Sequence, residues 1–478
     1  MSPADQILAH FERLSAIPRG TKNEAAIRQW LMDWAASRGL TNKTDKIGNL
    51  VIVVPVSAGR ENAQTLILQG HLDMVCQKTP DSNHDFTRDP ICIIHEGDWL
   101  KADKTTLGAD NGIAIAIAMA LAEDESISHP PLELLFMVEE EFGITGADNL
   151  DPQLITGKTL VNLDSEEDGV FTVGCAGGGS TYITLPVIWS AVSKNDVFFE
   201  LKISGLQGGH SGEDINKHRG NANKILVRTL DEIQRHFPIR LVTFNGGTAR
   251  NAIPRDAQAL FSCPKESSAL GNEIVTSFEK NLQVEFSNIE QGPFLALSKK
   301  QPSISSAITF EDTKKAIQLL VALPNGVAEM SAEIEGFVET SNNIGITELL
   351  QDGFHIVSNQ RSSVISRLEE MTRRTQAISE LAGAKTERTK ITPPWQPNMD
   401  SPLLKKCIEV HESLYHQQPK VELSHGGLEC GVISERCGGM DTISLGPTIE
   451  NPHSPDEKLF IPSLSRTWDF LSALLRSV

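Results

Sequence analysis

The sequence predicts an α/β protein in which a mostly parallel sheet with covering helices is interrupted by an inserted α+β domain. Short apolar runs of strand length alternate with longer segments of helical character, which is typical of a parallel sheet covered on both faces. At 478 residues the chain is also too long for one ordinary core. We therefore expect a first domain made of residues 1–185 and 385–478, with residues 186–384 inserted as the second.

The first part of this domain alternates strands with helices. Leu66–Leu68 is an apolar run that indicates a strand buried on both faces. The elements expected are two helices within 4–38 around a turn at Pro18-Arg19-Gly20, strands at 50–56 and 65–68, a short strand pair at 91–103, a tight turn at 108–112, a helix at 113–123, and strands at 132–138 and 158–163.

The inserted domain shows two rounds of similar elements, which indicates a structural duplication. Its expected strands are 197–203, 239–245, 257–263, 329–340 and 353–359, and its expected helices are 219–236, 266–281, 310–322 and 362–382. A polar stretch after Gly383 then predicts a linker back to the first domain. The last part is expected to contain a helix at 400–416, a loop at 424–431, a strand at 441–445 and a final helix from about 462.

Composition narrows the classes of function. With 43 basic and 62 acidic residues the formal net charge is −19, which disfavours nucleic acid and anionic membranes as partners. No apolar run approaches the roughly 18 residues of a membrane-spanning helix, and the first residues do not resemble a secretory signal. The seven scattered cysteines predict a reduced, cytoplasmic chain without a thiolate zinc site. Any metal ion would have to be held by carboxylates and imidazoles.

Acidic and histidine residues follow the predicted parallel strands. His71 and Asp73 follow the strand expected at 65–68, and in an extended segment residues i and i+2 point to the same side. Because ligand sites of such sheets lie beyond the carboxyl ends of the strands, these side chains are expected to converge. The metal-ligand candidates gathered in this way are His71, Asp110, Glu141, Asp164 and His453.

Two imidazoles and three carboxylates suit a pair of zinc ions, with manganese or cobalt as substitutes. A two-metal site needs one bridging carboxylate and ions about 3.5–4 Å apart. One shared ligand and two more for each ion account for all five candidates. A further carboxylate that is not a ligand is needed to move the proton of the attacking water, and the triplet Glu139-Glu140-Glu141 supplies one.

Eight motif regions between residues 70 and 457 carry a resemblance to a known family. They are GHLDMV, LGADNGI, EEFGITGA, NLDSEEDG with GCAGG, GGHSGEDI with GNANK, ARNAIPRDA, SHGGLECG and NPHSPDE. In this order they resemble the zinc-dependent metallopeptidase superfamily of aminoacylases and glutamate carboxypeptidases, and most closely its aminoacyl-histidine dipeptidases, the Xaa-His or cytosolic non-specific dipeptidases. The resemblance implies a cytoplasmic enzyme that hydrolyses Xaa-His and related dipeptides with two Zn²⁺, for which Mn²⁺ or Co²⁺ can substitute.

The resemblance also implies a role for each site residue. Asp110 would bridge the two ions, and the Asp110–Asn111 peptide bond would be cis. Glu140 would be the general base, and Asp73 would orient His71. The remaining ligands would form two pairs, His71 with Asp164 and Glu141 with His453.

Residues of the inserted domain are implied to bind the substrate as a lid closes over it. His210 and Asn251 match positions that contact the substrate carbonyl or carboxylate, and Arg361 is a candidate for the substrate carboxylate. Glu429 lies where a free amino group would be recognised. The run Glu166-Glu167-Asp168 is expected to be a solvated turn, although it echoes the family.

Two alternatives remain open at this stage. An N-acyl-amino-acid deacylase of the same superfamily would share every metal ligand, and a non-catalytic relative would keep the fold as a binding module. Intact ligands and an intact Glu140 argue against the second. The sequence is compatible with a homodimer but does not require one.

Overall fold

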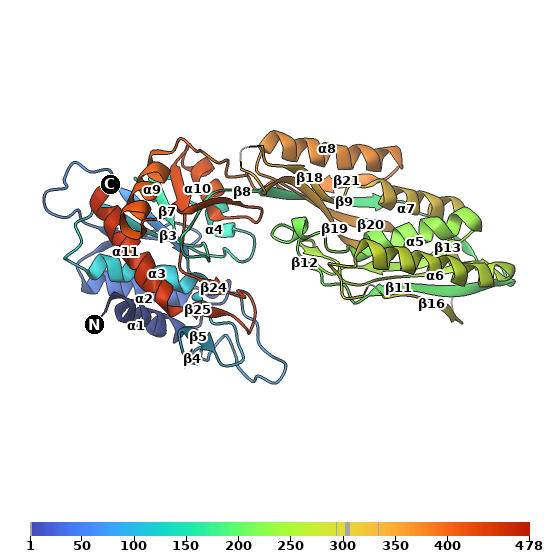
Figure 1. Ribbon diagram of the computed structural model, residues 1–478, viewed down its shortest axis with the longest axis horizontal. Helices are drawn as coiled ribbons and strands as arrows, with labels where there is room; N and C mark the ends of the chain where they lie inside the picture. The colour runs from blue at the N-terminus through green and yellow to red at the C-terminus, as the bar shows by residue number, and fades with distance from the viewer. Residues whose placement is uncertain (1, 293, 302–305, 333) are drawn as a thin grey trace. The chain divides into compact units, whose positions relative to one another are not determined.

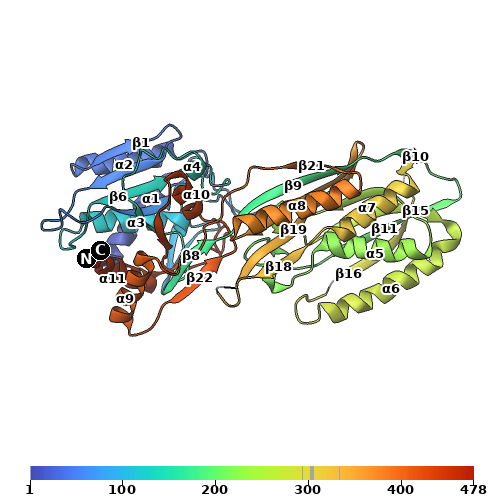
Figure 2. The ribbon, with the colours of Figure 1, turned by 90° about the horizontal axis from the view of Figure 1, so that it is seen from above.

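The chain forms two compact units (Figures 1 and 2). The structure, a computed structural model, describes residues 2–292, 294–301, 306–332 and 334–478, and all elements given below belong to these residues. The first unit comprises Met1–Cys175, Trp395–Ser424 and Leu428–Val478, and the second comprises Ala176–Pro394 and His425–Gly427. The ends of these units differ from the domain boundaries expected at 185/186 and 384/385, which stay a prediction.

A mixed sheet forms the centre of the first unit. Its strand order is β1 (Thr41–Thr44), β2 (Leu50–Val54), β6 (Leu132–Met137), β3 (Leu66–His71), β7 (Thr159–Asn162), β23 (Asp441–Ser444), β8 (Val170–Cys175) and β22 (Lys420–Ser424). The pairs β6–β3, β3–β7, β7–β23 and β8–β22 are parallel. The pairs β1–β2, β2–β6 and β23–β8 are antiparallel. The predicted fold class, with its mostly parallel sheet, is confirmed.

Helices cover both faces of this sheet. They are α1 (Pro3–Ser15), α2 (Ala25–Ser37), α3 (Ala109–Glu123), α4 (Thr145–Asp148), α9 (Pro402–Tyr415), α10 (Glu429–Arg436) and α11 (Ile461–Ser477). Helix α3 packs on β3 and against α1, and residues Asn111–Leu121 are buried, as expected for a helix that is apolar all round. On the opposite face, Ile67, Leu135 and Leu160 pack in one cluster with Ile433 of α10.

The loop expected at 424–431 is partly wrong, because residues from Glu429 onward form helix α10. This segment contains Gly431 and Cys430, residue types with low helix propensity. Burial of Cys430, Val432 and Ile433 against the sheet stabilises the helix instead. Here tertiary packing outweighs local preference.

A small antiparallel sheet connects the polar excursion near residue 91 with the end of the chain. It contains β24 (Ile449–Glu450), β25 (Lys458–Phe460), β5 (Trp99–Ala102) and β4 (Ile93–Glu96) in that order. Residues 451–457 therefore form the loop between β24 and β25. This loop carries His453 and is fixed at both ends by the sheet.

The second unit is a broad antiparallel sheet with helices packed on it. Its order is β16 (Phe294–Lys300), β11 (Asp196–Ser204), β15 (Ala257–Pro264), β13 (Arg240–Gly246), β19 (Val338–Leu350), β20 (Gly353–Ser362), β9 (Gly177–Leu185) and β21 (Lys385–Arg388), and β18 (Gly326–Met330) also pairs with β19. The helices are α5 (Ala222–His236), α6 (Ser268–Glu285), α7 (Phe310–Ala322) and α8 (Ile365–Leu381). Both rounds of predicted elements share this one sheet.

Short elements complete the second unit. They are β10 (Trp189–Ala191), β12 (Gly209–His210), β14 (Ala252–Ile253), β17 (Ser306–Ile308), and the 3₁₀ turns Ile215–Lys217 and Lys265–Ser267. Residues 385–388 were expected to open a linker but form the edge strand β21, whose mostly exposed side chains explain its polar sequence. No helix among the described residues is long and apolar enough to cross a membrane.

Candidate metal centre

Three neighbouring strands of the first unit bring imidazole and carboxylate groups to one edge of the sheet. His71 is the last residue of β3, which pairs in parallel with β6 on one side and β7 on the other. Glu141 follows β6, and Asp164 follows β7. Asp110 lies in the first turn of α3, which packs on β3. The buried strands β3, β6 and β7, and helix α3 packed on β3, thus fix the backbone positions from which these side chains extend.

The two carboxylate oxygens of Asp110 face two different histidines. His71 Nε2 lies 3.1 Å from Asp110 Oδ1, and His453 Nε2 lies 2.9 Å from Asp110 Oδ2. A second carboxylate accompanies each ring: Asp164 Oδ1 is 3.4 Å from His71 Nε2, and Glu141 Oε2 is 3.2 Å from His453 Nε2. Oδ1 of Asp110 therefore lies beside the His71–Asp164 pair, and Oδ2 lies beside the His453–Glu141 pair.

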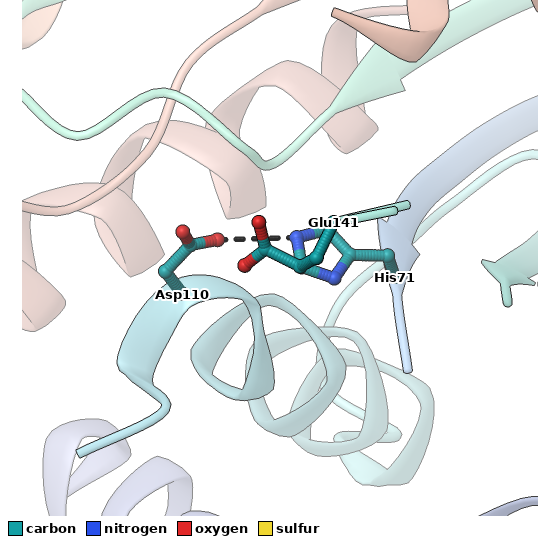
Figure 3. A group of neighbouring side chains, drawn as sticks. All are labelled: His71, Asp110 and Glu141. Carbon is teal, nitrogen blue, oxygen red and sulfur yellow. Dashed lines mark hydrogen bonds and ion pairs between the residues drawn. The ribbon is translucent and has the colours of Figure 1, made fainter. Parts of the chain in front are cut away.

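Figure 3 shows three of these side chains converging from β3, from the start of α3 and from the segment after β6. One ligand atom from each of His71, Asp110 and Glu141 lies within 4.8 Å of the other two. The backbone around Asp110 departs from the helix, and the Asp110–Asn111 peptide bond is cis, as expected from the sequence.

The residues of this cluster fit divalent cations. Nitrogen and oxygen donors of this kind are those that zinc and manganese take in proteins. In the described part of the chain, Glu141 Oε1 is a buried carboxylate oxygen without a hydrogen-bond partner. Because an unpaired buried charge is costly, this oxygen favours a cation beside it. Asp110 and the four groups around it make five candidate ligands, which are enough for two ions.

The surrounding acids are strongly perturbed. Burial raises the pKa of Glu140 well above its usual value, and the nearby carboxylates of Asp164 and Glu141 add to this effect. Burial also raises the pKa of Asp164 to about 6, with further contributions from Asp110 and Glu141. Such clusters of perturbed acids are typical of functional sites.

The same carboxylates also raise the pKa values of the two histidines, because they stabilise the protonated imidazoles. Hydrogen bonds to Asp110 and Glu141 raise the pKa of His453 to about 11. Burial alone would lower the pKa of His71, but the neighbouring carboxylates, Asp164 first, outweigh burial and raise it well above its usual value. The cluster thus concentrates negative charge that favours any cation within it.

Asp73 is connected to more than the histidine ring. Its Oδ1 lies 3.4 Å from His71 Nδ1, which agrees with the predicted orienting role. The same carboxylate accepts hydrogen bonds from the backbone N–H groups of Glu140, at 3.0 Å, and Glu141, at 3.2 Å. Thr21 Oγ1 donates a further one at 2.9 Å. Asp73 therefore joins the end of β3 to the segment that carries Glu140.

Two further acids lie close to the cluster. Glu429 is fully buried, accepts a 2.6 Å hydrogen bond from Gln69 Nε2, and has its pKa raised well above the usual value by burial. Its predicted role at a free amino group stays a prediction. The expectation of a solvated turn at Glu166-Glu167-Asp168 is met in part: Glu167 is exposed, whereas Glu166 and Asp168 are half-buried, and burial, with Asp110 and Asp164 nearby, raises the pKa of Glu166 to about 9. In the sequence, the position of Glu166 two residues after the ligand candidate Asp164 is the feature that indicates its closeness to the cluster.

The predicted substrate-binding residues lie together in the second unit. His210 ends β12, and its Nε2 is 3.4 Å from Nη2 of Arg361 near the end of β20. The backbone carbonyl of Asn251 accepts a 2.8 Å hydrogen bond from the N–H of Ser211, next to His210. His425, for which the sequence leaves a functional and a structural role equally open, belongs to this group: burial, with Arg361 and His210 nearby, lowers its pKa to about 3.

Comparison with known proteins identifies the family. Residues 200–290 match the family model described as the M20 peptidase dimerisation domain. The cytosol non-specific dipeptidase of Escherichia coli (strain K12) is 38% identical over 468 residues, which cover 98% of this chain and 96% of that protein. This chain belongs to the dipeptidases of the M20 metallopeptidase family. It is therefore a peptide hydrolase, and the resemblance stated from the sequence is confirmed.

Solved structures agree with this membership. The aminoacylhistidine dipeptidase of Vibrio alginolyticus has a TM-score of 0.87 and 37% identity, with 99% of this chain and 96% of that chain covered. The aminopeptidase PepT of Bacillus cereus ATCC 10987 has a TM-score of 0.56 at 16% identity, with 99% of this chain and 98% of that chain covered, and shares the fold.

Proposed function

We propose that the chain is a cytoplasmic di-zinc dipeptidase that hydrolyses Xaa-His and related dipeptides, with Glu140 as the general base. The observation that carries the proposal is the geometry of Asp110, whose Oδ1 and Oδ2 face His71 and His453 respectively. A carboxylate that faces two imidazoles in this way would serve as the ligand shared by two cations. The dipeptidase name of relatives covering almost the whole chain supports the substrate class.

The ligands divide into two sets that share Asp110. His71 and Asp164 would hold one ion, and Glu141 and His453 the other, in line with the pairs formed by these groups. Zinc ions bound there would lower the pKa of a water molecule towards about 7 and polarise the peptide carbonyl. Manganese or cobalt would suit the same nitrogen and oxygen donors.

Glu140 would take the proton of the attacking water and deliver it to the leaving amine. Its carboxyl group lies among the ligands without an ion pair to either histidine among the described contacts. Its raised pKa is in the direction expected of a group that takes up a proton during the reaction. Asp73 supports this step because it fixes the Glu140 backbone through a 3.0 Å hydrogen bond.

The second unit would supply the groups that bind the rest of the substrate. Arg361 carries a guanidinium that can bind a terminal carboxylate through two parallel hydrogen bonds. His210 and Asn251 would stabilise the oxyanion of the reacting carbonyl. Closure of this unit as a lid would exclude water and restrict the substrate to short peptides. Glu429 would recognise the free amino group.

The match of residues 200–290 to a peptidase dimerisation domain supports a homodimer. Light scattering of the purified chain would test this. A mass of one chain at micromolar concentration would contradict the dimer and leave the dipeptidase proposal unaffected.

A substrate panel tests the proposed activity most directly. The protein stripped of metal and reloaded with zinc, manganese or cobalt would be assayed on β-Ala-His, Gly-Gly and other dipeptides, matched tripeptides and N-acetyl amino acids. We expect hydrolysis of dipeptides that depends on added metal and disappears on chelation. Faster hydrolysis of the N-acetyl amino acids would contradict the proposal and support the deacylase. Activity that survives complete removal of metal would contradict the role of the cluster.

A further inference from the structure

A buried arginine lies beneath the metal centre. Arg19 is 2% exposed, although arginine is almost never fully buried unless it is paired. Its Nη1 donates hydrogen bonds to the carbonyl oxygens of Leu72, at 3.0 Å, and Asp73, at 2.8 Å. Its Nη2 donates to the carbonyl oxygen of Gly108. One guanidinium thus ties the segment after His71 to the turn that precedes Asp110.

Two glycines of the LGADNG motif make room for this guanidinium. A Cβ atom at Gly108 would lie 2.6 Å from Arg19 Nη2, and one at Gly112 would lie 2.5 Å from the same atom. Contacts that short do not occur between real side chains, so a side chain at either position would displace the arginine. Gly108 also has a φ of +70°, which favours glycine on its own. Gly112 has no such backbone reason.

A buried glutamate holds the same turn from the other side. Glu457 is 2% exposed and comes from the loop between β24 and β25 that also carries His453. Its Oε2 accepts hydrogen bonds from the N–H groups of Leu107, at 2.8 Å, and Gly108, at 3.0 Å. Its Oε1 accepts from Ala109, at 2.8 Å, and Asp110, at 3.3 Å.

These hydrogen bonds give α3 a cap from a distant part of the chain. The first N–H groups of a helix lack intrahelical partners and carry a partial positive charge. Gly108, the residue at the cap position, has no side chain to satisfy them. Glu457 satisfies them, and its negative charge also acts on Arg19. Arg19 and Glu457 therefore fix the backbone next to Asp110 from two sides, and their charges are of opposite sign.

From these contacts, and resting on the proposed function, we infer that Arg19 and Glu457 are positioning residues that prearrange the two-metal site. Arg19 fixes the backbone of His71 relative to that of Asp110, and Glu457 fixes the loop of His453 relative to Asp110. The three backbones that carry the bridging carboxylate and its two imidazoles are thus held by the backbone hydrogen bonds of two buried charged side chains. In this inference, neither Arg19 nor Glu457 contacts the metal or the substrate.

Metal affinity separates this role from a purely structural one. We would measure the affinity of the metal-free full-length chain for zinc by competition with a chromogenic chelator. Groups that position ligands typically change metal affinity about 10- to 100-fold when they are replaced. We expect a loss of that size in Glu457→Gln and Arg19→Lys, with excess zinc restoring kcat and leaving KM near the parental value. Parental zinc affinity in both variants would overturn the inference.

The chain offers matched controls for both substitutions. Glu133 is 4% exposed and accepts hydrogen bonds from the N–H groups of Thr156 and Gly157, at the end of β6 away from the site. Arg240 donates to backbone carbonyl oxygens, among them that of Ile308, in the second unit. Glu133→Gln and Arg240→Lys should lower stability but keep zinc affinity within about twofold of the parent. A change of that size is far below the loss expected for residues that position metal ligands. An equal loss of affinity in these controls would overturn the inference.

Gly112→Ala provides a test that changes no charged group. The added methyl would displace the Arg19 guanidinium, while alanine is a better helix former than glycine. We expect weaker zinc binding without loss of secondary structure, so this variant decides the matter if Glu457→Gln does not fold. Unchanged zinc affinity in Gly112→Ala would count against the positioning role. A parent that loads zinc but cleaves no dipeptide would instead contradict the proposed function.

Discussion

The two clusters of functional candidates differ in the charge that they accumulate. In the first unit, burial and neighbouring carboxylates raise the pKa of Asp164 to about 6 and that of Glu166 to about 9. In the second unit, burial and the positive charge of Arg361 and His210 lower the pKa of His425 to about 3. Under the proposed function, the first cluster would bind cations and the second would bind the substrate carboxylate, so the two tasks would belong to separate units.

The clusters also differ in how firmly they are held. Asp73 and Glu457 each accept several backbone hydrogen bonds from the segments that carry the metal-ligand candidates. In the second unit, Asn251 is exposed, and His210 and Arg361 are half-buried at strand ends. If the second unit closes as a lid, as proposed, it would bring adjustable substrate contacts to a rigid metal site.

Removing the bridging carboxylate should have the largest effect. Asp110→Asn should lose both ions, because each depends on one oxygen of this residue. Activity should then fall by more than the roughly 10²–10⁴-fold that loss of a proton-transfer group costs. Elemental analysis would measure the metal, and Glu125→Gln, an exposed change just beyond α3, would be the control. Parental metal content in Asp110→Asn would contradict the bridging role.

Replacing the general base should leave the metal in place. Glu140→Gln should keep both ions and lower kcat by about 10²–10⁴-fold, since only proton transfer is lost. Glu139→Gln is the matched control, because Glu139 is the neighbouring acid of the same triplet. If Glu139→Gln lost the activity and Glu140→Gln kept it, the base would be misassigned by one residue.

A change in the second unit should alter binding more than chemistry. Arg361→Lys keeps the charge but loses the paired donors of the guanidinium. A hydrogen bond to a charged group contributes about 1.5–3 kcal/mol, so KM should rise roughly 10- to 100-fold with kcat nearly unchanged. Arg367→Lys, an exposed arginine of the same unit, should leave both constants as they are. An unchanged KM in Arg361→Lys would contradict the proposal that Arg361 binds the substrate carboxylate.

The smallest expected effect is on how the free energy of unfolding depends on pH. His425 is 8% exposed, and its pKa in the folded chain is about 3. In the unfolded chain its pKa is about 6.5, so below that pH the unfolded chain binds a proton that the folded chain does not. Stability should therefore decrease from pH 6.5 to 5, by about 2 kcal/mol from this group. Urea unfolding would show a weaker pH dependence in His425→Gln than in the parent. The exposed His236→Gln should behave like the parent, and equal slopes in all three would contradict the prediction.

Sequence patterns locate the strand-end residues well because their positions follow from the sheet. His71 and Asp164 follow apolar runs, and parallel pairing through β3 brings them together. Arg19 was seen only as part of a turn, and Glu457 only as part of a motif. Their partners are supplied by folding: Leu107 and Glu457 are 350 residues apart in the chain. Nothing local to either residue indicates such a contact, and the same holds for the packing that forms α10.

The cap on α3 has a consequence for how the enzyme matures during translation. The segment with His71 and Asp110 leaves the ribosome long before residues 453–457, which supply the second imidazole and the cap. A stop codon ahead of residue 453 would leave the bridging acid with one histidine and an uncapped helix. Under the proposed function, hydrolysis would therefore require translation at least as far as residue 457, and products that stop earlier should be inert.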